Sequence, residues 1–302
     1  MRVLIATDGS PSAAQAVALV AGVPWPAGTD IQIVEAVETS RAIFGGPWGT
    51  SVIVEDDIAL HDELVRMAGE SVERARARCA AVGLACRATV LQGRPATVIV
   101  EAASAMDADL VVVGSRGRGT IESMVLGSVS AEVVGQAASP VLVARGSGIA
   151  RIVLAWDGSE HARRAASLLT AWPIFGGSAV RVVSVTDTRV PWWSGFPETG
   201  TPTAMPIYLD AAEAARRAHD TLATEMAAEL RANGIDAEPE HREGDAATQI
   251  IAAAEADRAD LIVMGTHGRT GLTRLVAGSV ARNVLHHAPC SVLVTRPPRD
   301  GR

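Results

Sequence analysis

GSRGRGTIESMVLGSVS at residues 114–130 recurs as GTHGRTGLTRLVAGSVA at residues 265–281, and this repeat is the main indication of the fold. Both copies read Gly-x-x-Gly, then nine residues, then Gly-Ser-Val. Each follows an aliphatic run, DLVVV at 109–113 and DLIVM at 260–264, and such runs are typical of buried parallel strands. The sequence therefore contains the same strand, glycine loop and helix twice.

Glycines between a buried strand and a helix indicate an anion site. Glycine lets the backbone approach a ligand closely, and a helix start offers unpaired N–H groups with a partial positive charge of about half a unit. Ser128 and Ser279, at the expected helix starts, would each add a hydroxyl donor. The pattern predicts a polyphosphate at each copy, and the alternative for each is a tight turn without a ligand.

The composition bounds the class of protein. A chain of 302 residues with 48% hydrophobic residues is long enough for two domains with separate cores. The formal net charge of −7 argues against nucleic acid as a partner, since nucleic-acid-binding proteins present a basic face. The sequence has no run of about 18 apolar residues, and its N-terminus lacks the form of a signal peptide. We therefore expect a cytoplasmic protein without a membrane partner.

Lysine is missing from the sequence, and all 27 Lys or Arg positions are arginine. This excludes a P-loop lysine, a Schiff-base lysine and a lysine general base. The three cysteines, Cys79, Cys86 and Cys290, have no metal-ligand spacing, and we expect buried thiols that form no disulfide. No set of residues predicts a catalytic site or a metal bound by the protein alone.

The first strand of each half also repeats. RVLIAT at 2–7 ends at Asp8-Gly9-Ser10, and RIVLAW at 151–156 ends at Asp157-Gly158-Ser159. The offset between the halves is 149 residues here and 151 at the glycine motif, as in an internal duplication with one small insertion. The sequence predicts domains at 1–147 and 148–302.

Strands and helices alternate in the same order in both halves, which predicts an α/β fold with a doubly wound parallel sheet in each. The expected helices lie at 11–22, 56–82, 160–171 and 210–232, and the further strands at 31–37, 86–91, 141–145, 179–185, 236–241 and 292–296. In such sheets ligands bind beyond the carboxyl ends of the strands, where the strand order reverses. Asp8 and Gly114 would meet there if the first and fourth strands are neighbours.

Both halves resemble the universal stress protein domain. The resemblance is carried by the strand-end aspartates, by Gly93 and Gly244 before the third helix, by the glycine motifs and by the closing VLV strands. It covers nearly the whole chain and implies two five-stranded parallel sheets of order 3-2-1-4-5. It also implies that the halves pair through their last strands as a pseudo-two-fold dimer within the chain, with a homodimer of chains as an open alternative.

In the nucleotide-binding branch of the family, ATP lies across the ends of strands one and four, and we expect Mg²⁺ to accompany its phosphates. The resemblance implies that Asp8 and Asp157 lie against the nucleoside and that Ala36 and Val185 face the adenine. The remaining implied contacts are Val113, Gly114, Gly117, Gly127, Ser128, Val129 and Ser130 in the first half, and Met264, Gly265, Gly268, Gly278, Ser279, Val280 and Ala281 in the second.

Some of these residues have alternative roles. The aspartates could instead be helix caps, although Ser10 and Ser159 can serve as caps and leave Asp8 and Asp157 for the nucleoside. Four loop residues would either contact phosphate or be exposed to solvent: Arg116, Arg118, His267 and Arg269.

The two halves also depart from the family and from each other. Ala281 replaces Ser130, which would remove a hydroxyl that could reach phosphate. Glu35 and Ser184 stand where the family often has histidine.

We expect a nucleotide-binding stress-response protein that acts as a sensor or regulator, with at most slow ATP hydrolysis. The alternative is an interaction module for an unknown protein partner, built on the aromatic connections 38–55 and 187–209. These connections could also cover the sites as lids or clasp the two halves together. A third hypothesis, an enzyme that activates a substrate with ATP, rests on fold analogy alone.

Overall fold

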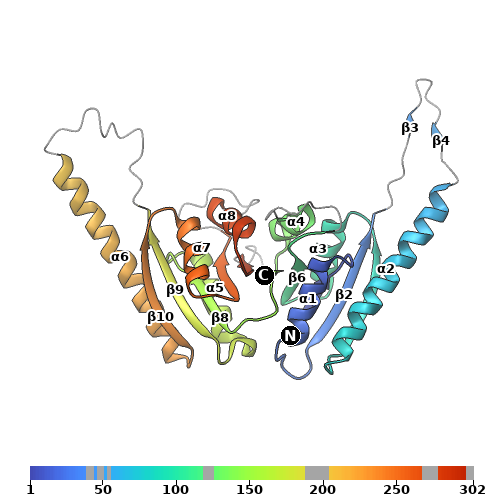
Figure 1. The fold of residues 1–302 in the computed structure, drawn as a ribbon, viewed down its shortest axis with the longest axis horizontal. Helices are drawn as coiled ribbons and strands as arrows, with labels where there is room; N and C mark the ends of the chain where they lie inside the picture. Colours follow the sequence, from blue (N-terminus) through green and yellow to red (C-terminus); the bar gives the residue numbers. More distant parts are fainter. Residues whose placement is uncertain are drawn as a thin grey trace. The chain divides into compact units, whose positions relative to one another are not determined.

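The computed structural model describes residues 1–38, 44–45, 51–52, 56–117, 126–187, 204–266 and 278–296 (Figure 1). The chain divides into two compact units, Met1–Ser147 and Gly148–Arg302. Each unit is a parallel sheet with helices on its faces, and each is described separately below.

The first unit contains β1 (Arg2–Ala6), α1 (Pro11–Gly22), β2 (Asp30–Val37), β3 (Phe44–Gly45), β4 (Ser51–Val52), α2 (Asp56–Ala80), β5 (Cys86–Gln92), α3 (Pro95–Ala105), β6 (Leu110–Gly114), α4 (Ser128–Gln136) and β7 (Val141–Ala144). Its sheet has the order β5-β2-β1-β6-β7, and every one of these pairs is parallel. This confirms the expected order 3-2-1-4-5.

The second unit contains β8 (Arg151–Ala155), α5 (Glu160–Ala171), the 3₁₀ turn η1 (Pro173–Phe175), β9 (Ala179–Thr186), α6 (Ala204–Ala232), β10 (Asp236–Glu243), α7 (Ala246–Ala256), β11 (Leu261–Gly265), α8 (Ser279–His287) and β12 (Ser291–Thr295). The sheet order β10-β9-β8-β11-β12 repeats that of the first unit, again with parallel pairs.

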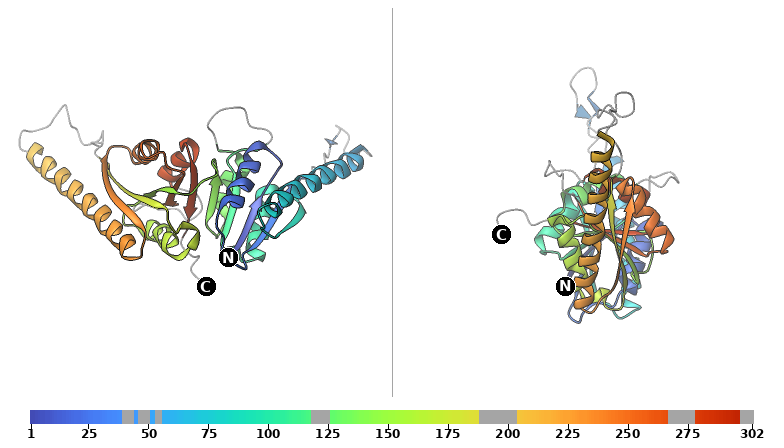
Figure 2. Two further views of the ribbon diagram at one scale, coloured as in Figure 1. Left: turned by 60° about the horizontal axis from the view of Figure 1, so that its bottom comes forward. Right: turned by 90° about the vertical axis from the view of Figure 1, so that its left-hand side faces the viewer.

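The central strands form the cores. β6 and β11 are buried at all five positions, because helices cover both faces of the sheet at these strands. In the first unit α1 packs with α2 and α3 packs with α4. In the second, α6 runs along β9 and β10 (Figure 2), while α5 packs on β11 and α7 on α8.

Gly93 and Gly244 end the third strand of each unit with φ angles of 133° and 126°. L-residues with a side chain rarely adopt these angles, which explains glycine at both positions. The two N–H groups donate to the carbonyls of Val37 and Thr186, each at 3.0 Å. These bonds join the ends of the second and third strands beside the start of the next helix.

Several elements differ from the expected bounds. α6 begins at Ala204, six residues before the predicted start, and η1 was not predicted. The connection 38–55, expected without regular structure, contains the short antiparallel pair β3 and β4. The expected role of the two aromatic connections as lids concerns side chains that lie outside the described residues.

The cysteines are all thiols in the described part of the chain. Cys79 and Cys290 are buried, as expected. Cys86 is only half-buried, because it begins the edge strand β5, and the expectation of burial was wrong for this residue.

Candidate nucleotide site

The carboxyl ends of β1 and β6 lie side by side in the first unit, and those of β8 and β11 do so in the second. Asp8 follows β1 and the glycine loop follows β6, so both arrive at one edge of the sheet. A Cβ atom added to Gly117 would lie 2.9 Å from Asp8 Oδ2. The sheet therefore brings the aspartate and the glycine loop of the first unit together.

Gly114 allows α1 to begin directly against the end of β6. A Cβ atom at this position would lie 2.8 Å from Ala13 N and 2.8 Å from both the carbonyl carbon and Oγ of Ser12. Gly265 has the same role, since its Cβ would lie 2.6 Å from Cβ of His161 and 3.0 Å from Ala162 N. The first glycine of each motif is thus required by helix packing.

Serine, and not aspartate, caps the first helix of each unit. Ser10 Oγ accepts a hydrogen bond from Ala13 N at 3.2 Å, and Ser159 Oγ accepts one from Ala162 N at 3.2 Å. This confirms the predicted capping role of the serines. Asp8 Oδ1 accepts from Ser10 N at 3.0 Å, which holds the carboxylate at the strand end. Asp157 makes the same bond to Ser159 N at 3.0 Å.

A network that sequence reasoning missed holds the start of the first glycine loop. The hydroxyls of Ser12 and Ser115 are hydrogen-bonded at 3.2 Å, and Arg116 N donates to Ser12 Oγ at 3.0 Å. Ser10 Oγ also lies 3.4 Å from Arg116 O. The signal in the sequence was the second serine in the helix start, Ser12, two positions after the cap.

A glycine immediately precedes the helix that follows each glycine motif. Gly127 precedes α4, and its N–H donates to Ser115 O at 2.8 Å. Gly278 precedes α8 and donates to Thr266 O at 2.8 Å. Among the described residues, no side chain caps either helix start. The first turns of α4 and α8 are therefore held at the strand ends. No described side chain caps the backbone N–H groups of these turns.

The side chains of the first turn of α4 differ in exposure. Ser128 and Val129 are exposed, whereas Ser130 is buried and its hydroxyl donates to Gly114 O at 2.7 Å. Ala281, its counterpart in α8, is also buried. The difference between Ser130 and Ala281 therefore changes a hydrogen bond within the fold, where we had expected a change in a phosphate donor.

The other predicted contacts occupy two environments. Val113 and Met264 are buried within β6 and β11. Ala36, Val185 and Val280 are half-buried, and Ser279 is exposed. Gly268, Arg118, His267 and Arg269 lie outside the described residues.

Glu35 and Ser184 are buried one residue before Ala36 and Val185, so their side chains point to the opposite face of the sheet. Ser184 Oγ is hydrogen-bonded to Nδ1 of His219 in α6 at 2.8 Å. These two departures from the family therefore lie on the face opposite to the predicted adenine contacts.

The second unit carries a different pair at the start of its first helix. His161 stands in the place of Ser12 and Thr266 in the place of Ser115. His161 Nδ1 and Thr266 Oγ1 are hydrogen-bonded at 3.1 Å, and Thr295 Oγ1 donates to His161 O at 3.3 Å. The two sites are thus similar in backbone but not in the side chains that hold the loop.

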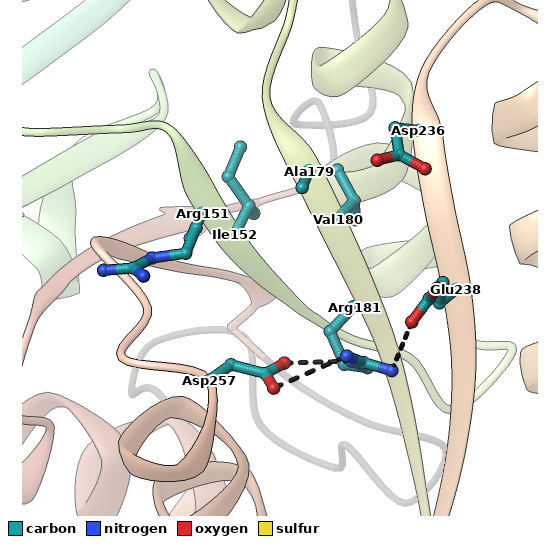
Figure 3. Close-up of a pocket in the computed structure, with 8 residues that line it drawn as sticks. All are labelled: Arg151, Ile152, Ala179, Val180, Arg181, Asp236, Glu238 and Asp257. Carbon is teal, nitrogen blue, oxygen red and sulfur yellow. Dashed lines mark hydrogen bonds and ion pairs between the residues drawn. The ribbon is translucent and has the colours of Figure 1, made fainter.

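A cavity of ≈ 220 Å³ lies at the opposite edge of the second sheet, at the amino ends of β8, β9 and β10 (Figure 3). Arg181 donates to Asp257 at 2.9 Å and to Glu238 at 2.7 Å. The hydrogen bond to Asp257 is the main cause that raises the pKa of Arg181. This arginine is therefore committed to ion pairs within the protein, and the cavity is distinct from the strand ends that carry the glycine motifs.

Two further properties concern the residues that the structure describes. None of the helices there is long and apolar enough to cross a membrane. His, Cys, Asp and Glu side chains do not gather there in groups of three or more that could hold a metal ion.

Comparison with known proteins gives consistent matches. The model of the Universal stress protein family matches residues 1–145 and again residues 148–296. A universal stress protein of Thermus aquaticus, named for the QAH/OAS sulfhydrylase 3′ region, is 35% identical over 145 residues, 47% of this chain and 97% of that protein. A universal stress protein of Mycolicibacterium smegmatis is 27% identical over 258 residues, which is 83% of this chain and 83% of that protein. The crystal structure of a universal stress protein from Archaeoglobus fulgidus DSM 4304 shares the fold, with a TM-score of 0.69 and 20% identity over 99% of this chain and 97% of its own.

Proposed function

Because the chain belongs to the universal stress protein family, with a family domain in each unit, we propose that it binds an adenine nucleotide at each glycine motif. ATP is the ligand that the resemblance implies, and Mg²⁺ would accompany its phosphates, since this ion is commonly held between carboxylates and substrate phosphates. The bound nucleotide would make the protein a sensor or regulator in a stress response.

The observation that carries this proposal is the start of α4 beside Asp8 and Gly117. Gly127 is held to the end of β6 by its bond to Ser115, so the first turn of α4 faces the same edge of the sheet as the aspartate. Helix starts bind phosphate because their N–H groups and the helix dipole both favour negative charge. The exposed Ser128 hydroxyl would add a donor at this point.

The nucleoside would lie toward the second strand. Asp8 is held at the end of β1 by Ser10 N, and a carboxylate can accept hydrogen bonds from ribose hydroxyls. Ala36 is half-buried near the end of β2, the strand beside β1. A small apolar side chain there would leave room for a planar base against the strand.

We propose at most slow hydrolysis at these sites. The chain has no lysine, and the described Ser184–His219 pair is unsuited to nucleophilic catalysis, because Ser184 is 0% exposed and no substrate can reach its hydroxyl. Among the described residues near Asp8 and Gly117, no histidine or lysine is placed as a general base for an attacking water. In the second unit His161 lies beside Gly265, and its Nδ1 is hydrogen-bonded to Thr266 Oγ1.

Calorimetric titration of the nucleotide-free chain with Mg-ATP, Mg-ADP, AMP and adenosine tests the proposal. We expect two binding events with Mg-ATP and a weaker affinity at each loss of a phosphate. A charge-assisted hydrogen bond contributes about 1.5 kcal/mol or more, so each lost contact should weaken binding roughly tenfold.

Two outcomes of this titration would count against the proposal. Equal affinities for adenosine and Mg-ATP would mean that phosphate does not contact α4 or α8. The absence of heat with all four ligands, together with no nucleotide released on denaturing the purified chain, would contradict nucleotide binding as a whole.

A further inference from the structure

Two cysteine thiols meet where α2 turns back into β5. Cys79 lies in the last turn of α2, and Cys86 is the first residue of β5. Gly83, with a φ of 82°, reverses the chain between them, and Leu84 N donates to Cys79 O at 3.0 Å. This tight turn places the two side chains next to each other: each thiol affects the pKa of the other, and Cys86 Sγ donates a hydrogen bond to Leu84 O, inside the turn, at 3.8 Å.

The pair is asymmetric in access. The Cys79 side chain is 0% exposed, whereas Cys86 is half-buried on the edge strand. A reagent in solvent can therefore reach Cys86 but not Cys79. The arrangement pairs one partly exposed cysteine with one that solvent does not reach.

The second unit fills the same place without sulfur. Leu230 and Ala237 correspond to Cys79 and Cys86, and both are buried at 1% exposure. Leucine and alanine therefore satisfy the packing between the long helix and the edge strand. Packing alone does not require two cysteines at this place in the first unit, and the proposed nucleotide sites do not use them.

We propose that Cys79 and Cys86 are a modification site, at which a low-molecular-weight disulfide such as oxidised glutathione converts the two thiols into an intramolecular disulfide. The Cys86 thiolate attacks one sulfur of the oxidant, forms a mixed disulfide and releases one glutathione thiol. Cys79, after losing its proton, attacks the Cys86 sulfur and releases the second glutathione thiol. The protein loses two electrons and two protons, and the oxidant gains them.

The disulfide would join the end of α2 covalently to the edge strand β5. Its formation would be slow at neutral pH, because burial and the neighbouring Cys79 thiol raise the pKa of Cys86 to about 12. Burial also raises the pKa of Cys79. Only the thiolate attacks a disulfide, and its fraction grows tenfold per pH unit below the pKa. We therefore expect the rate of oxidation to rise about tenfold per pH unit between roughly pH 7 and 9.

Peptide mass spectrometry tests the proposal on the full chain. After incubation with oxidised glutathione, the chain is quenched with acid, denatured, alkylated and cut with trypsin after arginine. Cleavage after Arg78 and after Arg87 releases the nonapeptide CAAVGLACR, residues 79–87, which contains both cysteines. We expect this peptide to lack alkyl groups and to be lighter than its reduced form by two hydrogen atoms. Dithiothreitol should restore two alkylatable thiols.

The chain offers matched controls. Cys86→Ala and Cys79→Leu copy the second unit at Ala237 and Leu230, so both variants should fold. Cys86→Ala should leave Cys79 alkylated and without a glutathione adduct, and the peptide that contains the buried Cys290 should be alkylated in every sample. Cys79→Leu should stop at a mixed disulfide on Cys86.

Two results would overturn the proposal. One is recovery of residues 79–87 with both cysteines alkylated after prolonged oxidation at pH 9. The other is a wild-type chain that stops at a mixed disulfide on Cys86, because this would mean that Cys79 cannot reach the Cys86 sulfur in the folded protein.

Discussion

Replacement of Ser128 by glutamate is expected to weaken Mg-ATP binding at the first site on the order of 100-fold. Ser128 is the exposed first residue of α4, where we place phosphate. A carboxylate about 5 Å from a phosphate costs about 3 kcal/mol at an effective dielectric constant near 20. Since about 1.4 kcal/mol is tenfold in affinity, this corresponds to roughly two powers of ten. Calorimetric titration of the full chain measures the effect.

The substitution has good controls because its effects on binding and on stability have opposite signs. Glutamate at a helix start stabilises the helix by about 0.3–1 kcal/mol, so unfolding cannot explain a loss of binding. Ser128→Gln has the same length without the charge and should lose only the hydroxyl contact. Ser279→Glu should affect the second site alone. If Ser128→Glu and Ser128→Gln bind Mg-ATP equally well, phosphate does not lie at α4.

Replacement of Gly114 by valine is expected to destabilise the first unit by at least about 3 kcal/mol, at the upper end of overpacking costs. Its Cβ alone would lie 2.8 Å from Ala13 N and from the Ser12 carbonyl carbon. Because both are backbone atoms, the clash cannot be relieved by rotation of a side chain, and the start of α1 must move. Denaturant unfolding of the purified variant measures the change in the free energy of unfolding.

Gly135 supplies the matched control for this prediction. It lies inside α4, and a Cβ atom there would meet nothing within 4 Å. Gly135→Ala should therefore raise stability by about 0.5–1 kcal/mol, the usual gain from alanine within a helix. Gly265→Val should destabilise the second unit as Gly114→Val does the first. A Gly114→Val variant as stable as the wild type would contradict the close approach of α1 and β6.

The strands and the position of the glycine loops could be predicted because their signals are local and occur twice. Aliphatic runs identified β6 and β11, and the motif spacing placed Ser128 and Ser279 at helix starts. The resemblance then supplied the neighbouring positions of the first and fourth strands. The capping role of Ser10 could also be predicted, since it depends only on a residue three positions further along.

The contacts that were missed join residues distant in sequence. Ser12 and Ser115 are 103 residues apart, and only the close approach of α1 to β6 makes them partners. The burial of Ser130 against Gly114 depends on the same packing. Such contacts require the relative position of a helix and a strand to within an ångström, which residue patterns do not encode.

The thiol pair was missed for a different reason. Cys79 and Cys86 are only seven residues apart, but in the sequence they fall on opposite sides of the boundary between a helix and a strand. Their approach depends on where α2 ends, and that end was predicted two residues too late. With the helix ending at Ala80, the turn at Gly83 directs β5 back along it.

The exchange of Ser12 and Ser115 for His161 and Thr266 bears on how such a chain would respond to its ligand. Two identical, independent sites fill over the same range of concentration and report a single threshold. We expect sites whose loops are held by different side chains to differ in dissociation constant, and such sites fill in succession. A duplicated chain of this kind can therefore give a graded signal across a wider span of nucleotide concentration than either of its halves alone.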